Sequence, residues 1–175
     1  LILTKPIGTG ILATALKRNL LGKNELEIMT RSMSQLNKTA SEVMNEFDVS
    51  ACTDVTGFGL LGHLYEMTSA SNCNVTLNMR SIPVLAGVEN HIAAGIIPGG
   101  SNENLKHFGK HCVFQEISEL QKIILADAQT SGGLLIAIKK AEGVKLLNRL
   151  RESGIEQSVV IGECMEEGNG IITVR

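Results

Sequence analysis

The segment ACTDVTGFGLLGH, from Ala51 to His63, constrains the fold most, because it joins a strand pattern to a helix pattern through closely spaced glycines. The apolar residues of Val49–Val55 predict a strand, and those of Thr56–Ser69 predict the helix that follows it. The glycines at this junction spell G-x-G-x-x-G and are Gly57, Gly59 and Gly62. A strand, a glycine turn and a helix in this order are typical of a dinucleotide-binding site.

Two features of the surrounding sequence argue against a dinucleotide site. Such a fold places an acid about 20 residues beyond the glycines, where it binds the ribose hydroxyls. The corresponding segment, Leu77–Arg80, reads LNMR and contains no acid. Asp54 also ends the preceding strand, where its carboxylate would repel an arriving pyrophosphate by about 1 kcal/mol or more. A dinucleotide-dependent oxidoreductase is therefore disfavoured.

The position of Asp54 suits a metal ligand better. A carboxylate at the end of a strand, beside a glycine turn, is well placed to hold a Mg²⁺ that bridges phosphate oxygens. Magnesium commonly takes one or two carboxylates together with phosphates and waters, and no second acid stands close to Asp54 in the sequence. The remaining ligands would come from distant parts of this chain or from outside it. The alternative that stays open is that Asp54 only caps the following helix.

Apolar patterns along the rest of the chain predict an α+β domain with a mixed β-sheet and flanking helices. The expected strands are Leu1–Pro6, Val49–Val55, Asn74–Met79 and Leu134–Ile138, with a closing hairpin of Ser158–Met165 and Gly170–Val174. The expected helices are Ile11–Leu21, a stripe from Leu26 to Phe47 that breaks near Asn37–Thr39, Thr56–Ser69, Val84–Ala94, Glu119–Ala126 and Ala141–Ser153. Pro98–Asn102 is expected to be a loop.

Composition limits the classes of partner. The chain has 175 residues, which predicts one domain that folds on its own without disulfide or metal. A net charge of −2 without a basic cluster, together with 3% aromatic residues, argues against nucleic acid as a partner. The apolar runs are too short to cross a membrane. Four cysteines without paired spacing are typical of reduced thiols, so a cytoplasmic location is expected. The first residue is Leu1 rather than Met, so we expect a piece of something longer.

Four segments together carry a resemblance to a known family. They are LTKPIGTGI (Leu3–Ile11), TDVTGFGLLGH (Thr53–His63), PGGSNENL (Pro98–Leu105) and DAQTSGGLL (Asp127–Leu135). In order and spacing they resemble the C-terminal half of selenophosphate synthetase, also called selenide, water dikinase. TSGGLL is shared with the wider superfamily of aminoimidazole ribonucleotide synthetase. The resemblance covers essentially residues 1–175 and implies the C-terminal domain fold of that superfamily.

The resemblance also implies a function. The family makes selenophosphate from ATP, selenide and water, and releases AMP and phosphate. Its ATP-binding loop, its reactive cysteine or selenocysteine, its essential lysine and its main homodimer contact lie in an N-terminal domain that this sequence does not contain. Asp54 matches the one metal-binding aspartate of the C-terminal domain, so Mg²⁺ and ATP are the implied cofactor and substrate. This sequence alone is therefore expected to be inactive.

The sequence leaves the roles of several residues open. Lys5 and His63 are candidates for contact with a phosphate, and the loop Asp127–Gly133 is either an anion-binding nest or a structural turn. The alternatives to selenophosphate synthesis are another activity of the aminoimidazole ribonucleotide synthetase superfamily and a non-catalytic interaction module.

Overall fold

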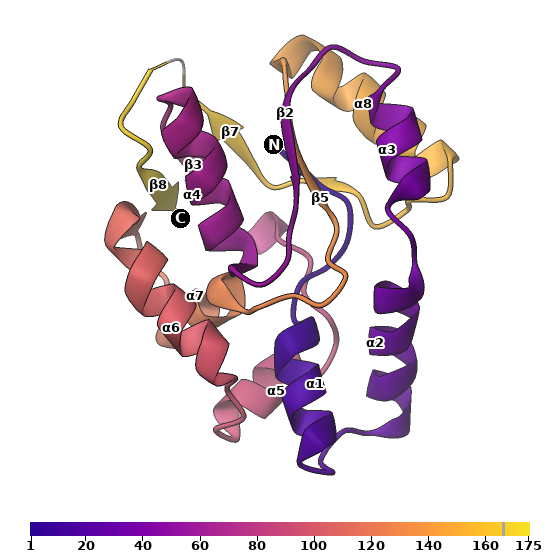
Figure 1. The fold of residues 1–175 in the computed structure, drawn as a ribbon, viewed down its shortest axis with the longest axis vertical. Helices are drawn as coiled ribbons and strands as arrows, with labels where there is room; N and C mark the ends of the chain where they lie inside the picture. The colour runs from indigo at the N-terminus through magenta and orange to yellow at the C-terminus, as the bar shows by residue number, and fades with distance from the viewer. Residues whose placement is uncertain (166) are drawn as a thin grey trace.

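The computed structural model describes residues 1–165 and 167–175, which form two four-stranded sheets with helices packed around them (Figure 1). The strands are β1 (Ile2–Leu3), β2 (Val49–Asp54), β3 (Val75–Leu77), β4 (Cys112–Phe114), β5 (Leu134–Ile138), β6 (Val159–Val160), β7 (Gly162–Cys164) and β8 (Ile172–Val174). The α-helices are α1 (Thr9–Lys17), α2 (Lys23–Ser34), α3 (Lys38–Met44), α4 (Gly59–Ser71), α5 (Val88–Ala93), α6 (Gly99–Phe108), α7 (Glu119–Ala126) and α8 (Lys140–Glu152). The α+β class is confirmed. No helix within residues 1–165 or 167–175 has the length and apolarity that a membrane crossing requires.

The two sheets differ in strand direction. The first has the order β2-β5-β1-β6 and is antiparallel throughout. The second has the order β4-β8-β3-β7 and is mixed, because β8 runs parallel to both of its neighbours while β7 runs antiparallel to β3. The expected mixed sheet is therefore present, beside a second sheet that the apolar patterns did not separate from it.

The predicted closing hairpin is wrong. β7 and β8 do not pair with each other, because β3 lies between them and pairs with both. The side chain of Asn74 explains part of this arrangement, since its Oδ1 accepts hydrogen bonds from the N–H groups of Asn169 at 3.0 Å and Ile171 at 2.9 Å. These bonds bring the returning segment to the far side of β3. Residue 166 of the predicted hairpin lies outside the described residues.

β5 is the central element of the first sheet and is buried on both faces. Leu135 and Ala137 pack in the larger hydrophobic core, to which α1 and α4 contribute. Leu134 and Ile136 alternate with them and pack in a smaller core with residues of α3 and α8. Figure 1 shows α3 and α8 on one side of β2 and β5, and α4 on the other. Because helices cover both faces, the strand reads as an uninterrupted apolar run.

The predicted elements agree with the structure to different degrees. The strand Val49–Val55, the helix Glu119–Ala126 and the strand Leu134–Ile138 are confirmed within one residue. The break in the long apolar stripe is also confirmed, since α2 and α3 are separate helices. The loop predicted at Pro98–Asn102 is wrong, because α6 begins there at Gly99.

Two buried side chains stabilise the start of α6. Ser101 donates a hydrogen bond to the carboxylate of Asp127 at 2.9 Å. Asn104 donates to the backbone carbonyl of Gly57 at 2.8 Å and to that of Ala126 at 3.1 Å. These contacts join α6 to α7 and to the turn before α4. They stabilise a helical backbone at Gly99 and Gly100, two residues that by themselves disfavour a helix.

The N-terminus of α1 is bound by two side chains from the loop that follows α7. A helix leaves its first N–H groups without partners inside the helix. Here the Oε1 atom of Gln129 and the carboxylate of Asp127 accept hydrogen bonds from four of them, at 2.9 to 3.4 Å. The donors are Gly8, Thr9, Gly10 and Ile11. Two distant parts of the sequence are thereby locked together beside β1 and β5.

The Asp127 carboxylate is fully buried. Burial raises its pKa to about 6, against the hydrogen bonds from Ser101, Gln129 and the two backbone groups, which favour the charged form. The charged carboxylate is therefore less stable in the folded protein than in water.

The glycines before and within α4 have unequal roles. Gly59 has a φ of +68°, and a Cβ there would lie 2.7 Å from the carbonyl group of Ala126. A Cβ at Gly62 would lie 2.5 Å from Cβ of Phe58 and 2.7 Å from the ring of Phe108. A Cβ at Gly57 would meet nothing within 4 Å. Gly59 and Gly62 are thus required by the packing of α4 against its neighbours.

We expect Asp127 to make the protein less stable as the pH rises from about 4 to about 6. The folded protein keeps the Asp127 proton up to a pKa of about 6, whereas the unfolded chain releases it near the ordinary value of 3.8. Folding therefore takes up a proton between these pH values, and the free energy of unfolding falls across this window. Asp127→Asn removes the titration, so its stability relative to wild type should rise by up to about 3 kcal/mol between pH 4 and pH 7.

Urea unfolding of both proteins at a series of pH values measures this difference. Asp48→Asn is the control, because the Lys139 ammonium lowers the pKa of the exposed Asp48 carboxyl, so this pair loses its contribution as the pH falls. Equal pH slopes for wild type and Asp127→Asn would contradict the assignment.

We also expect the three glycines of the G-x-G-x-x-G segment to respond differently to alanine. Gly62→Ala should lower the free energy of unfolding by about 1–3 kcal/mol through overpacking, and Gly59→Ala by a similar amount through backbone strain. Gly57→Ala should change it by less than about 0.5 kcal/mol, since its Cβ enters open space. Thermal unfolding of the three variants measures these differences. Equal losses of stability in all three would show that packing does not explain why glycine stands at these positions.

Candidate functional site

Asp54 combines a fixed backbone with a free carboxylate. It is the last residue of β2, an edge strand of the first sheet, and it lies opposite Leu134 of β5. The next residue, Val55, is fully buried and donates a hydrogen bond from its N–H to the carbonyl of Gly133 at 2.9 Å. The Asp54 residue itself is exposed, and within residues 1–165 and 167–175 its carboxylate has no hydrogen-bond or ion-pair partner. The carboxylate is therefore available to a ligand from outside.

Asp54 does not cap the helix that follows it. α4 begins at Gly59, and Phe58 occupies its N-cap position without a side-chain hydrogen bond. The residues from Val55 to Phe58 lie between the aspartate and the helix. The capping role that the sequence left open is thus not adopted in this structure.

His63 supports the turn after Asp54 from inside α4. Its Nε2 lies 3.1 Å from the hydroxyl oxygen of Thr56, and its Nδ1 lies 3.1 Å from the carboxylate of Glu66. The contact with Glu66 is an ion-pair distance without hydrogen-bond alignment. The ring is buried and lies beside Phe58, with 5.5 Å between the ring centroids. These contacts place His63 behind the turn, where it holds Thr56.

The Lys5 side chain is buried and hydrogen-bonded inside the protein. It is only 3% exposed, and its Nζ donates to the backbone carbonyls of Gln35 at 2.6 Å and Ser131 at 2.8 Å. Burial lowers the pKa of its ammonium group. Lys5 therefore ties the link between α2 and α3 to the loop before β5.

The backbone N–H groups at the start of the loop Asp127–Gly133 donate to other groups of the protein. The N–H groups of Ala128, Gln129 and Thr130 bind, in turn, the Ser101 hydroxyl, a carbonyl and the Thr9 hydroxyl. Its acceptors, Asp127 and Gln129, fill the N-terminus of α1, where an external anion would otherwise bind. The geometry favours the structural turn over an anion nest. The sequence did not single out Gln129, because its partners are 120 and 121 positions away.

The donor set around Asp54 fits one metal ligand rather than a complete site. Within the described ranges, no group of three or more histidine, cysteine or acidic side chains could hold a metal ion. The neighbouring Cys52 is not a reactive thiolate, since burial, and then the Asp54 charge, raise its pKa. An Asp54-bound Mg²⁺ would take its other ligands from outside the described residues, as one carboxylate with phosphates and waters allows.

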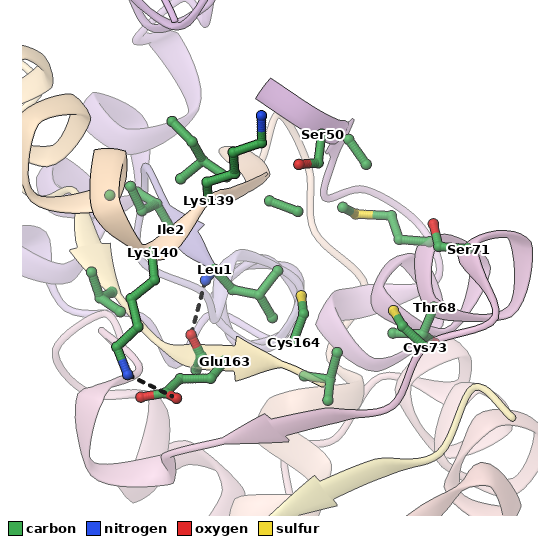
Figure 2. A pocket seen from close by; sticks show the side chains of 18 of the residues that line it. Leu1, Ile2, Ser50, Thr68, Ser71, Cys73, Lys139, Lys140, Glu163 and Cys164 are labelled. Carbon is green, nitrogen blue, oxygen red and sulfur yellow. Dashed lines mark hydrogen bonds and ion pairs between the residues drawn. The ribbon is translucent and has the colours of Figure 1, made fainter. Parts of the chain in front are cut away.

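The cavity drawn in Figure 2 lies elsewhere. It has a volume of about 620 Å³ and is lined by residues of β1, β2, β3, β5, β6, β7, α4 and α8, but not by Asp54. The candidate site is therefore an exposed carboxylate at a strand end, which is one ligand and not a complete metal site.

Known proteins resemble the chain over its whole length. It is 44% identical over 168 residues to a protein named selenide, water dikinase from Pelobacter propionicus, a match that covers 95% of this chain and 48% of that protein. It is 39% identical over 178 residues to a protein of the same name from Aliarcobacter butzleri, which covers 100% of this chain and 51% of that protein. The chain thus spans about half the length of these curated relatives.

The fold is similar to the crystal structure of the hydrogenase maturation protein HypE, with a TM-score of 0.65, 17% identity, and coverage of 99% of this chain and 48% of that chain. The resemblance found in the four sequence segments is confirmed by the curated relatives. Residues 1–175 match the family described as AIR synthase related protein, C-terminal domain. The chain therefore belongs to the C-terminal domain family of the AIR synthase related proteins.

Proposed function

We propose that this chain is the C-terminal domain of an ATP-dependent selenide, water dikinase, which makes selenophosphate and releases AMP and phosphate. Relatives of that name, 44% and 39% identical to the chain, support the activity. Because the chain spans about half of each relative, we infer that an N-terminal domain precedes it and binds ATP. On this proposal the enzyme is cytoplasmic, and its homodimer contact lies in that N-terminal domain.

Within this enzyme, Asp54 supplies one Mg²⁺ ligand to a site that the two domains share. The observation that carries this assignment is the exposed Asp54 carboxylate without a partner, at the end of a strand whose next residue is buried and hydrogen-bonded. When bound, the metal would neutralise the charge that develops on the transferred phosphoryl group. Asp54 would hold the cation through its carboxylate, and the paired and hydrogen-bonded end of β2 would keep that carboxylate in place.

The surrounding residues orient this carboxylate and keep the turn in place. The pairing of Asp54 with Leu134 fixes the position of Asp54 along the sheet. The contact of His63 with Thr56 fixes the turn that follows, and Gly59 lets the backbone enter α4 close to α7. A single carboxylate does not position Mg²⁺-ATP, so residues 1–175 alone are inactive on this proposal.

The decisive variant is Asp54→Asn in the longer protein. It keeps the side-chain volume but removes the charge that binds the cation, so AMP formation with ATP and selenide should fall by a factor of about 100 or more. The melting temperature should stay within about 2 °C, since none of the described residues forms a hydrogen bond or ion pair with the carboxylate. Excess Mg²⁺ should restore part of the rate.

Asp48→Asn is the matched control. Asp48 directly precedes β2, is exposed, and pairs with Lys139 at 2.6 Å, so it lies at the opposite end of the same strand. Its substitution should leave AMP formation unchanged. A wild-type rate for Asp54→Asn would refute the metal assignment, and absence of selenide-dependent AMP formation by the longer wild-type protein would refute the activity.

A further inference from the structure

A groove beside the first strand is lined mainly by hydrocarbon. Its walls come from β1, β2, β3, β5, α4, α8 and the segment β6–β7, and its volume is about 620 Å³ (Figure 2). Val144 and Val160 lie among the lining residues and are 65% and 43% exposed. The charged side chains at the rim are already paired, Lys139 with Asp48 and Lys140 with Glu163. The groove therefore suits an uncharged, apolar occupant.

Two open strand edges flank this groove. β5 pairs with β1 at Leu135 and Ile136, whereas its pairing with β2 continues to Ile138. In the described part of the chain, the last residues of β5 thus have no strand partner on the β1 side. β7 lies at the end of the second sheet, and in the described part of the chain its edge away from β3 has no strand partner, although Gly162 accepts there from the amino group of Leu1. An edge with unpaired N–H and C=O groups is a template for one more strand.

Leu1, the first residue of the sequence, lies in the groove. Leu1 is only 8% exposed; its amino nitrogen donates to the carbonyl of Gly162 at 2.8 Å, and its carbonyl accepts from Ile161 at 3.0 Å. Figure 2 shows Leu1 inside the hollow, with Lys139 and Lys140 on one side and Glu163 and Cys164 on the other. Continuing the antiparallel register of Ile2 with Ile136 places the residue before Leu1 opposite Ile138.

We propose that the polypeptide preceding Leu1 in the longer protein extends β1 by about three residues along β7, with the first of them also opposite Ile138 at the end of β5, and fills this groove. This rests on the proposed function only in that an N-terminal half precedes the chain. The added strand covers Val144 and Val160 and joins the two sheets by hydrogen bonds to Ile138 on one side and to the open edge of β7 on the other. A covalently attached segment that begins inside the groove loses no translational freedom on binding, unlike a second copy of the chain or an apolar small molecule.

Two short extensions of this chain test the proposal. One adds Val-Thr-Val before Leu1, with N–H groups that can donate to both edges and β-branched side chains that favour a strand. The other adds Pro-Ser-Pro, of the same length and with the same conversion of the Leu1 amine to an amide; its prolines keep their carbonyl acceptors but lack the N–H donors and disfavour a strand. Hydrogen exchange at the Ile138 amide, the melting temperature and sedimentation are measured for both.

The Val-Thr-Val extension should slow exchange at Ile138 by at least about tenfold relative to the Pro-Ser-Pro extension, and it should raise the melting temperature by about 3 °C. The longer protein should protect Ile138 to the same degree as Val-Thr-Val. Equal exchange and melting in both extended chains would overturn the proposal. Protection of Ile138 in the unextended chain that rises with concentration, together with dimers in sedimentation, would assign the groove to a second copy instead. No metal, ATP or selenide enters these assays, so their failure is distinct from failure of the proposed activity.

Discussion

The buried carboxylate of Asp127, with Gln129 beside it, is the contact on which the arrangement of this domain depends. A helix N-terminus inside a protein needs acceptors for its free N–H groups. α1 obtains them from a loop more than 100 residues further along the chain. The same carboxylate accepts from Ser101 at the start of α6. One acid thus connects three of the four segments that carry the family resemblance, and Asn104 connects the fourth through the carbonyl of Gly57.

Asp54 and Asp127, the two aspartates of the segments that carry the family resemblance, differ in role. Asp127 is fully buried and binds four donor groups, so its oxygens are occupied and its charge is costly. Asp54 is exposed, and its carboxylate has no partner within the described residues. The buried acid joins segments of the fold, and the exposed acid is available to a ligand. The N-terminus of α1, where an anion could bind, is occupied by the Asp127 carboxylate. Asp54 therefore remains the candidate for a shared metal site.

Local patterns predicted those elements whose cause is local. β5 and α7 were predicted with their observed bounds, because an apolar run buried on both faces and an amphipathic stretch are visible in a short window. α6 was missed because Gly99 and Gly100 favour a loop, while the bonds of Ser101 and Asn104 that stabilise the helix involve distant partners. The hairpin of β7 and β8 was wrong because strand pairing depends on β3, which lies far away in the sequence and has both edges free for them.

For the site, the sequence predicted Asp54, but not the contacts of its neighbours. Lys5 and His63 were candidates because lysine and histidine bind phosphates, yet their burial and partners depend on carbonyls of Gln35 and Ser131 and on Thr56. Gln129 carried no signal, since a glutamine in a polar loop has no preferred role until the helix it caps is in place.

We propose that Asp54 is a metal ligand contributed to a site shared between two domains. A crystal structure of the longer protein with Mg²⁺ and a non-hydrolysable ATP analogue tests this role. We expect an Asp54 carboxylate oxygen at about 2.1 Å from a Mg²⁺ that also contacts phosphate oxygens and acids of the other domain. A fully coordinated Mg²⁺ on the nucleotide with the Asp54 carboxylate more than about 4 Å from it would show that Asp54 is not a ligand.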